Sequence, residues 1–184
     1  DHGQVIIQPD KPTLARYRDE VEHHRSQAAE WSVLRDQPAV TTDGTEIQLG
    51  ANIEFPHEVE TCLERGASVI GLYRTEFLYL GAEEEPTEED HFVAYTHVIE
   101  TMAPRQVVIR TLDLGADKMG QLPLHEEENN PFLGVRSIRL SLRNLDLFRI
   151  QLRAALRASA LGSVRIMFPM ISTLDELRQA QEGL

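Results

Sequence analysis

The sequence contains a single cysteine, Cys62, which excludes an internal disulfide and favours a reducing, cytoplasmic setting. Cys62 falls within an expected helix, so we interpret it as a core or surface thiol and not as a nucleophile. The chain also lacks any stretch approaching the roughly 20 apolar residues of a membrane helix. We therefore expect no membrane span and no role for membrane lipid.

Positive charge is scarce as well. Lys and Arg number 18 against 30 Asp and Glu, which gives a formal net charge of −12 over 184 residues. Affinity for nucleic acids comes mainly from neutralising phosphates, so we expect no nucleic-acid partner. An acidic protein also repels small anions at long range, so any anion site in this chain needs a local cluster of cations.

From residue 45 onward, apolar strand patterns alternate with amphipathic helix patterns. We expect strands over residues 45–55, 67–74, 106–110 and 163–169, and helices over 56–66, 86–104 (with Thr87 as N-cap), 145–161 and from 172. This alternation predicts an α/β fold with a parallel sheet, either doubly wound or a (β/α) barrel. Because about four βα units are present and a closed barrel takes about 250 residues, we favour a partial TIM-type (β/α) barrel, its first four units, cut from a longer protein.

The N-terminal part has a different pattern. "GQVIIQPDKP" predicts a short strand that stops at Pro9, and a helix follows over residues 13–35. Apolar residues recur along this helix at alternating spacings of three and four, as in a heptad seam: Leu14, Tyr17, Val21, His24, Ala28 and Trp31. The helix is either a stiff interdomain linker that pairs with a neighbouring helix or an amphipathic helix packed on its own domain.

Two expected strands end in the same dipeptide. Within "SVIGLYRTEF" the apolar strand pattern ends in Arg74-Thr75, and within "VVIRTLDLGADK" it ends in Arg110-Thr111. Ligands of parallel sheets lie at the carboxyl ends of the strands. A third candidate is Arg136 in "NPFLGVRSIRL", which follows a Pro and a Gly that mark a turn. Three guanidinium groups there would suit a small, multiply charged anion. The alternatives are pairing with surface acids and, for Arg136, a basic helical face shared with nearby arginines.

Several further residues accompany these arginines. Asp113 could orient Arg110 through an ion pair, contact a metal, or serve only as a turn residue. Asn52 leaves the first strand toward the same edge, and it joins Asp113 as a residue that could support the site. For Glu76 and Lys118, the sequence does not distinguish a functional role from a structural one.

Five segments together resemble one family: "GLYRTEFLYL", "PTEED", "VVIRTLDLGADK", "NPFLGVRSIRL" and "FRIQLRAALRASALGSVRIMFPMIS". They are similar to the Enzyme I family of the bacterial phosphotransferase system, the phosphoenolpyruvate-protein phosphotransferases, in register from about Gly3 to the last residue. The resemblance implies a (β/α) barrel that binds phosphoenolpyruvate (PEP) and Mg²⁺ and forms a homodimer. It also implies a mobile phosphohistidine domain that passes the phosphoryl group to the carrier protein HPr for sugar uptake.

By motif position, the resemblance assigns Arg74, Arg110 and Arg136 to PEP binding. It implies that residues 1–40 are the end of the phosphohistidine domain plus a helical interdomain linker, and that residues 41–184 are the N-terminal half of the barrel. The phosphohistidine would precede residue 1, and the metal ligands and remaining catalytic groups would follow Leu184. We therefore expect no catalytic residue and no metal ligand in this fragment, and no turnover by it alone. Ala116 departs from the family, which usually has glycine there.

Other functions remain open at this point. The chain could be the barrel of a PEP synthase or a pyruvate phosphate dikinase, which share the substrate but act with nucleotide. It could also be a non-catalytic half-barrel kept for dimerisation or regulation. The sequence does not separate the sugar branch of the phosphotransferase system from its nitrogen-related branch.

Overall fold

The chain divides into two units, Asp1–Glu46 and Ile47–Leu184, in a computed structural model that describes residues 3, 5–80, 82, 85–114 and 135–184. The first unit contains helix α1 (Lys11–Ser32) and an isolated antiparallel bridge between Val40 and Glu46. Asp10 caps α1, because its side chain accepts a hydrogen bond from the backbone N–H of Thr13 at 2.9 Å. The described residues ahead of α1 are not paired in a sheet. The strand expected before Pro9 was expected to pair with a segment ahead of residue 1, so it stays a prediction.

Helix α1 buries none of its own residues within the described part of the first unit. The apolar seam lies open: Leu14 is 40% exposed, Tyr17 41% and Trp31 65%. Pairing of this helix with a partner helix therefore stays a prediction. No helix in the described part of the chain is both long and apolar enough to cross a membrane.

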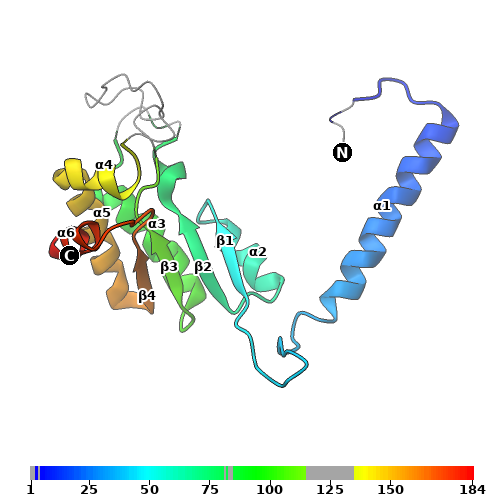
Figure 1. Cartoon of the computed structure of the whole chain (residues 1–184). Helices are drawn as coiled ribbons and strands as arrows, with labels where there is room; N and C mark the ends of the chain where they lie inside the picture. Colours follow the sequence, from blue (N-terminus) through cyan, green and yellow to red (C-terminus); the bar gives the residue numbers. More distant parts are fainter. Residues whose placement is uncertain (1–2, 4, 81, 83–84, 115–134) are drawn as a thin grey trace. The chain divides into compact units, whose positions relative to one another are not determined.

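The second unit is built on a parallel sheet (Figure 1). Its strands are β1 (Gly50–Ile53), β2 (Val69–Arg74), β3 (Val107–Arg110) and β4 (Val164–Met167), adjacent in that order. The helices are α2 (Glu58–Glu64), α3 (Glu88–Met102), α4 (Ile138–Arg143), α5 (Leu145–Ala158) and α6 (Leu174–Glu182), with short 3₁₀ turns η1 (Thr75–Leu78) and η3 (Ser159–Leu161). The α/β class and the four parallel strands are confirmed.

Helix α3 begins where its sequence predicts. Thr87 accepts a hydrogen bond from the N–H of Asp90, and the Asp90 carboxylate accepts one from the N–H of Thr87, which completes a capping box. The inner stripe of α3 is buried at Tyr95, Ile99 and Met102, and Phe92 is partly buried. Two elements were not expected from the sequence as separate pieces, η1 and α4. Helix α4 contains Arg139 and Arg143, so these two arginines lie on a helix, as the alternative of a basic helical face requires.

The two faces of the sheet have different environments. Ile53, Tyr73 and Ile109 are fully buried and pack against α3 and α5 in the main core. Residues that alternate with them, including Asn52 and Arg110, leave the opposite face, as the strand register requires. The strand order follows the chain without a reversal, whereas a doubly wound sheet reverses at a switch point. The order of the four described strands is consistent with a segment of a (β/α) barrel.

Candidate functional site

The carboxyl ends of β2 and β3 bring two arginines together. Arg74 and Arg110 are direct register partners in the parallel ladder, so their side chains leave the same face of the sheet from strands about 4.8 Å apart. Each arginine is followed by a buried threonine, Thr75 and Thr111. The Thr75 hydroxyl donates a hydrogen bond to the Arg110 carbonyl at 2.9 Å, which ties the two strand ends to each other.

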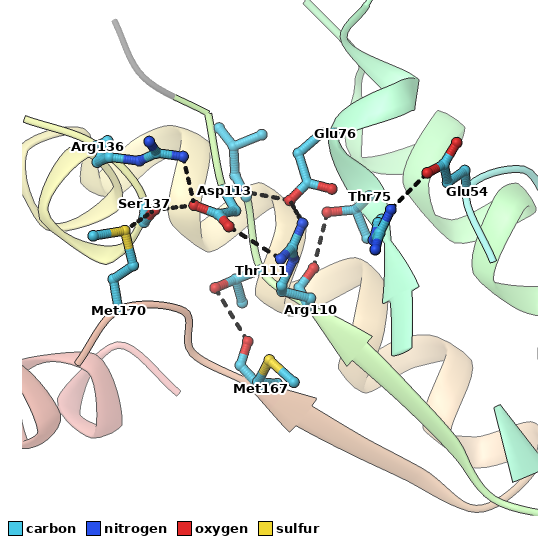
Figure 2. A network of polar contacts seen from close by, with 12 residues as sticks. Glu54, Thr75, Glu76, Arg110, Thr111, Asp113, Arg136, Ser137, Met167 and Met170 are labelled. Atoms are coloured by element: carbon cyan, nitrogen blue, oxygen red, sulfur yellow. Dashed lines mark hydrogen bonds and ion pairs between the residues drawn. The ribbon is translucent and has the colours of Figure 1, made fainter. Parts of the chain in front are cut away.

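Arg110 lies between two carboxylates (Figure 2). Its Nη2 is 2.7 Å from Glu76 Oε1, and its Nη1 is 3.0 Å from Asp113 Oδ2. The side chains are largely buried, with 19% of Arg110 and 6% of Glu76 exposed, so water screens these pairs weakly. The backbone N–H of Asp113 also donates to Glu76 Oε1 at 3.0 Å. Glu76 therefore fixes both the arginine and the loop that follows it.

Asp113 joins Arg110 to Arg136. Its second oxygen lies 3.5 Å from Arg136 Nη2 and also accepts a hydrogen bond from the Ser137 hydroxyl. Ser137 has a positive φ of 55° and its N–H donates to the carbonyl of Leu114, which holds the start of α4 against the end of the β3 segment. The structure thus places Arg136 beside Arg110 across one shared carboxylate.

Arg74 is engaged on the other side. Its Nη1 is 2.7 Å from Oε1 of Glu54, the residue after β1, and both side chains are more than a third exposed. Asn52 is exposed on β1, one residue before the strand ends, and its side chain makes no hydrogen bond within the described part of the chain. The expectations for Ala116 and Lys118 lie outside the described residues.

The site keeps several polar atoms without partners. Arg110 Nε, Arg136 Nε and Glu76 Oε2 are buried and have no hydrogen-bond partner among the described residues. Buried donors of this kind are costly unless an acceptor meets them. Two buried guanidinium N–H groups therefore lack an acceptor among the described residues, while three carboxylates balance the three arginine charges.

The described residues do not form a metal site. They contain no group of three or more His, Cys, Asp or Glu side chains arranged to hold an ion. Glu54, Glu76 and Asp113 are all committed to ion pairs with the arginines, whereas Mg²⁺ needs oxygens that can complete an octahedron. The described residues therefore do not fit Mg²⁺.

Sequence reasoning missed two parts of this site. Glu54 has no sequence signal, because only the pairing of β1 with β2 brings it to Arg74. Gln151 does have one: it is a polar residue on the inner, apolar stripe of α5, where it is 1% exposed. Its contacts are described below.

Comparison with known proteins assigns the chain to a family. Residues 28–184 match the family model described as "PEP-utilising enzyme, PEP-binding domain". The chain is 53% identical over 181 residues to a phosphoenolpyruvate-protein phosphotransferase of Bacillus sp. (strain S), covering 97% of this chain and 31% of that protein. Proteins of the same name from Bacillus subtilis (strain 168) and Staphylococcus aureus are 47% and 48% identical, over 98% of this chain and 32% of each relative.

The chain therefore spans about a third of the length of the curated relatives it matches. The family match covers the whole sheet and every arginine of the site. This chain belongs to the PEP-utilising enzyme family, because residues 28–184 match the model of that family's PEP-binding domain.

Proposed function

We propose that this chain is the PEP-binding part of a phosphoenolpyruvate-protein phosphotransferase, in which Arg74, Arg110 and Arg136 hold the substrate. One observation carries the proposal: arginines from adjacent strand ends and from the start of α4 meet at one edge of the sheet, with buried N–H groups on Arg110 and Arg136 that lack acceptors among the described residues. PEP carries a phosphate and a carboxylate, and both match the paired donors of guanidinium groups.

In this proposal the arginines act through charge. Phosphoryl transfer needs positioning and stabilisation of the charge on the transferred group more than covalent help from the protein. Arg110 is held by Glu76 and Asp113 on its terminal nitrogens, so its Nε–H direction is set before substrate arrives. Among the described residues Arg74 is paired only with the partly exposed Glu54, so it can exchange that carboxylate for phosphate oxygens. Asn52 and Asp113 support the site without contacting the phosphoryl group.

The wider setting follows from the resemblance and the relatives. We propose that residues 41–184 form the N-terminal half of a (β/α) barrel, which the sequential order of four parallel strands supports. Residues 1–40 would be the end of a phosphohistidine domain and a helical linker, and the division of the chain after Glu46 supports a boundary in that region. The whole protein would be a cytoplasmic homodimer that transfers the phosphoryl group of PEP to a histidine and then to HPr.

Mg²⁺ belongs to the proposal for the whole protein only. Bound beside PEP, it would neutralise phosphate and carboxylate oxygens. Because the described residues do not fit it, its ligands are proposed to come from elsewhere, and this chain's contribution is the set of arginines.

The test replaces Arg110 in the protein at its full natural length. Arg110→Ala removes a charge-assisted contact worth about 1.5–3 kcal/mol, so PEP-dependent phosphorylation of the histidine should fall at least about tenfold in kcat/KM. Arg110→Lys should restore only part of the lost kcat/KM, because lysine lacks the paired donors of a guanidinium group. Arg105→Ala is the matched control, since Arg105 is exposed and precedes β3 at the opposite edge of the sheet.

Removing Arg110 also leaves Glu76 buried without its partner, so folding must be checked by thermal unfolding. Arg110→Lys keeps the positive charge beside Glu76. If Arg110→Ala is unstable, the phosphorylation rate of Arg110→Lys tests the role of Arg110 instead. A phosphorylation rate in folded Arg110→Ala and Arg110→Lys equal to that of Arg105→Ala would remove Arg110 from the site.

A further inference from the structure

A buried amide lies directly behind the arginines. Gln151 is 1% exposed on α5, and its neighbours on the inner stripe of that helix are apolar: Leu147, Phe148, Leu152, Ala154 and Ala155. Burying a primary amide is unfavourable unless its donors and acceptor are all met. Here they are: Nε2 donates to Thr75 Oγ1 at 2.9 Å and to Tyr95 Oη at 3.1 Å, and Oε1 accepts from the N–H of Leu112 at 2.9 Å.

The direction of every bond around Gln151 is determined. The backbone N–H of Leu112 can only donate, so the amide oxygen must face it, and the NH₂ group must face Thr75 and Tyr95. Thr75 accepts from Gln151, so its own hydroxyl hydrogen goes to the Arg110 carbonyl. Gln151 therefore links the residue after Arg74 to the residue two positions after Arg110.

The network extends into the core. Tyr95 Oη, which accepts from Gln151, lies 3.0 Å from His91 Nδ1, and His91 Nε2 lies 3.0 Å from Tyr79 Oη. A neutral imidazole donates through one nitrogen and accepts through the other, in agreement with burial, which lowers the pKa of His91 to about 4. A chain of hydrogen bonds thus runs from the end of η1 through α3 and α5 to the two strand ends.

We propose that Gln151 is a positioning residue for the anion site: it sets the separation of the backbone segments that carry Arg74 and Arg110. This inference rests on the proposed function of those arginines. Within the described residues, the Gln151 side chain makes no hydrogen bond to Arg74, Arg136 or the carboxylates around them. Its effect must pass through Thr75 and Leu112, and a small shift of the strand ends misaligns guanidinium groups that must grip one anion together.

The experiment uses the protein at its full natural length and compares two substitutions. Gln151→Met keeps the volume but removes all three hydrogen bonds, so we expect kcat/KM for PEP to fall about 10- to 100-fold. Gln151→Glu keeps the acceptor for Leu112, and burial should raise the pKa of the new carboxyl. Once protonated it can donate one hydrogen bond, so the ratio of variant to wild-type kcat/KM should rise as the pH falls.

Two controls separate positioning from general loss of structure. Gln181→Met makes the same change at an exposed position of α6 and should leave kcat/KM unchanged. In the double variant Gln151→Met with Arg110→Ala, the loss of kcat/KM should be smaller than the product of the two single losses, because part of the effect of Gln151 passes through Arg110. Purely structural damage would multiply the two losses. Thr75→Val removes the hydroxyl that accepts from Gln151 and donates to the Arg110 carbonyl, so it should lower kcat/KM as Gln151→Met does, and it serves if that variant does not fold.

The outcomes distinguish this inference from the proposed function. If calorimetry shows that the wild type does not bind PEP, the proposed function fails and the inference falls with it. If the wild type binds PEP and Arg110→Ala does not, the proposed function stands. In that case, kcat, KM and pH profiles of Gln151→Met, Gln151→Glu and Thr75→Val equal to those of the wild type would overturn the role of Gln151.

Discussion

Arg74 and Arg110 are side by side in the sheet, yet their surroundings differ. Arg110 is enclosed by Glu76 and Asp113, and those pairs are buried. In the described part of the chain, the ion-pair partner of Arg74 is Glu54, and 40% and 36% of the two side chains are exposed. Exposed ion pairs contribute about 0.2–1 kcal/mol, because water screens them and the side chains lose freedom. Glu54 is therefore a competitor that an anion can displace, whereas Glu76 is a support for Arg110.

Glu54→Gln should tighten PEP binding. The substitution keeps the shape of the side chain but removes the negative charge that competes for Arg74 and repels the anion. From the strength of exposed ion pairs, we expect the Kd for PEP to fall about two- to fivefold, measured by calorimetry on the full-length protein. Glu60→Gln is the control, because it removes the same charge from α2, where Glu60 lies 3.3 Å from His97 and away from the arginines. Weaker binding by Glu54→Gln would instead identify Glu54 as a support.

At this scale the sequence predicts which arginines meet, but not what holds them. Strand ends of a parallel sheet converge, so an Arg-Thr pair at the end of two strands is enough to predict the neighbours Arg74 and Arg110. The contacts of Glu54 and Gln151 depend on packing between segments 20 and 76 residues apart in the chain. Local patterns carry no record of such distances, so Glu54 becomes visible only in the fold. For Gln151 the sequence shows a polar residue on an apolar stripe, but its partners become visible only in the fold.

Among the elements, the junction of η3 with α3 is unusually tight. Gly162 ends η3, and a Cβ there would lie 2.7 Å from Ile99 Cγ2. Ile99 is 1% exposed and β-branched, so its side chain has little freedom to move aside. Helices α3 and α5 cover the sheet together, and the absence of a side chain at Gly162 allows the end of α5 to approach α3.

Gly162→Ala should push these elements apart. Overpacking of this kind lowers the free energy of unfolding by about 1–3 kcal/mol, which urea denaturation can measure. Ser163→Ala is the control: Ser163 is exposed, so its replacement should change the free energy by no more than about 0.5 kcal/mol. Equal denaturation midpoints for the two variants would mean that the Ile99 side chain moves aside without lowering the free energy of unfolding.

The elements themselves follow from the sequence to different degrees. Thr87 and Thr173 both form capping boxes, and their side chains define the starts of α3 and α6 from local chemistry alone. β1 is shorter than its alternating pattern predicts, Gly50–Ile53 within residues 45–55, because only these residues pair with β2. Helix α4 has six residues, too few to give a periodic signal, so its separation from α5 at Asn144 was not foreseen.

For the molecule as a whole, the stability of the second unit depends on a neutral histidine. His91 is fully buried between Tyr79 and Tyr95, with its two ring nitrogens each 3.0 Å from a hydroxyl. Burial lowers its pKa from the ordinary 6.5 to about 4, and the charge of the adjacent Asp90 opposes this only partly. Between these two values the unfolded chain binds a proton that the folded chain does not.

The free energy of unfolding should therefore fall as the pH drops from about 6.5 to 4, with a slope from His91 of at most about 1.4 kcal/mol per pH unit. Above pH 6.5 both states are neutral at His91 and the contribution is flat. In His91→Gln the amide can still bridge the two tyrosines but does not titrate, so denaturation at a series of pH values should give a shallower slope in this window. Subtracting the two curves cancels the other titrating groups. Parallel curves would show that His91 is protonated in the folded protein as readily as in the unfolded chain.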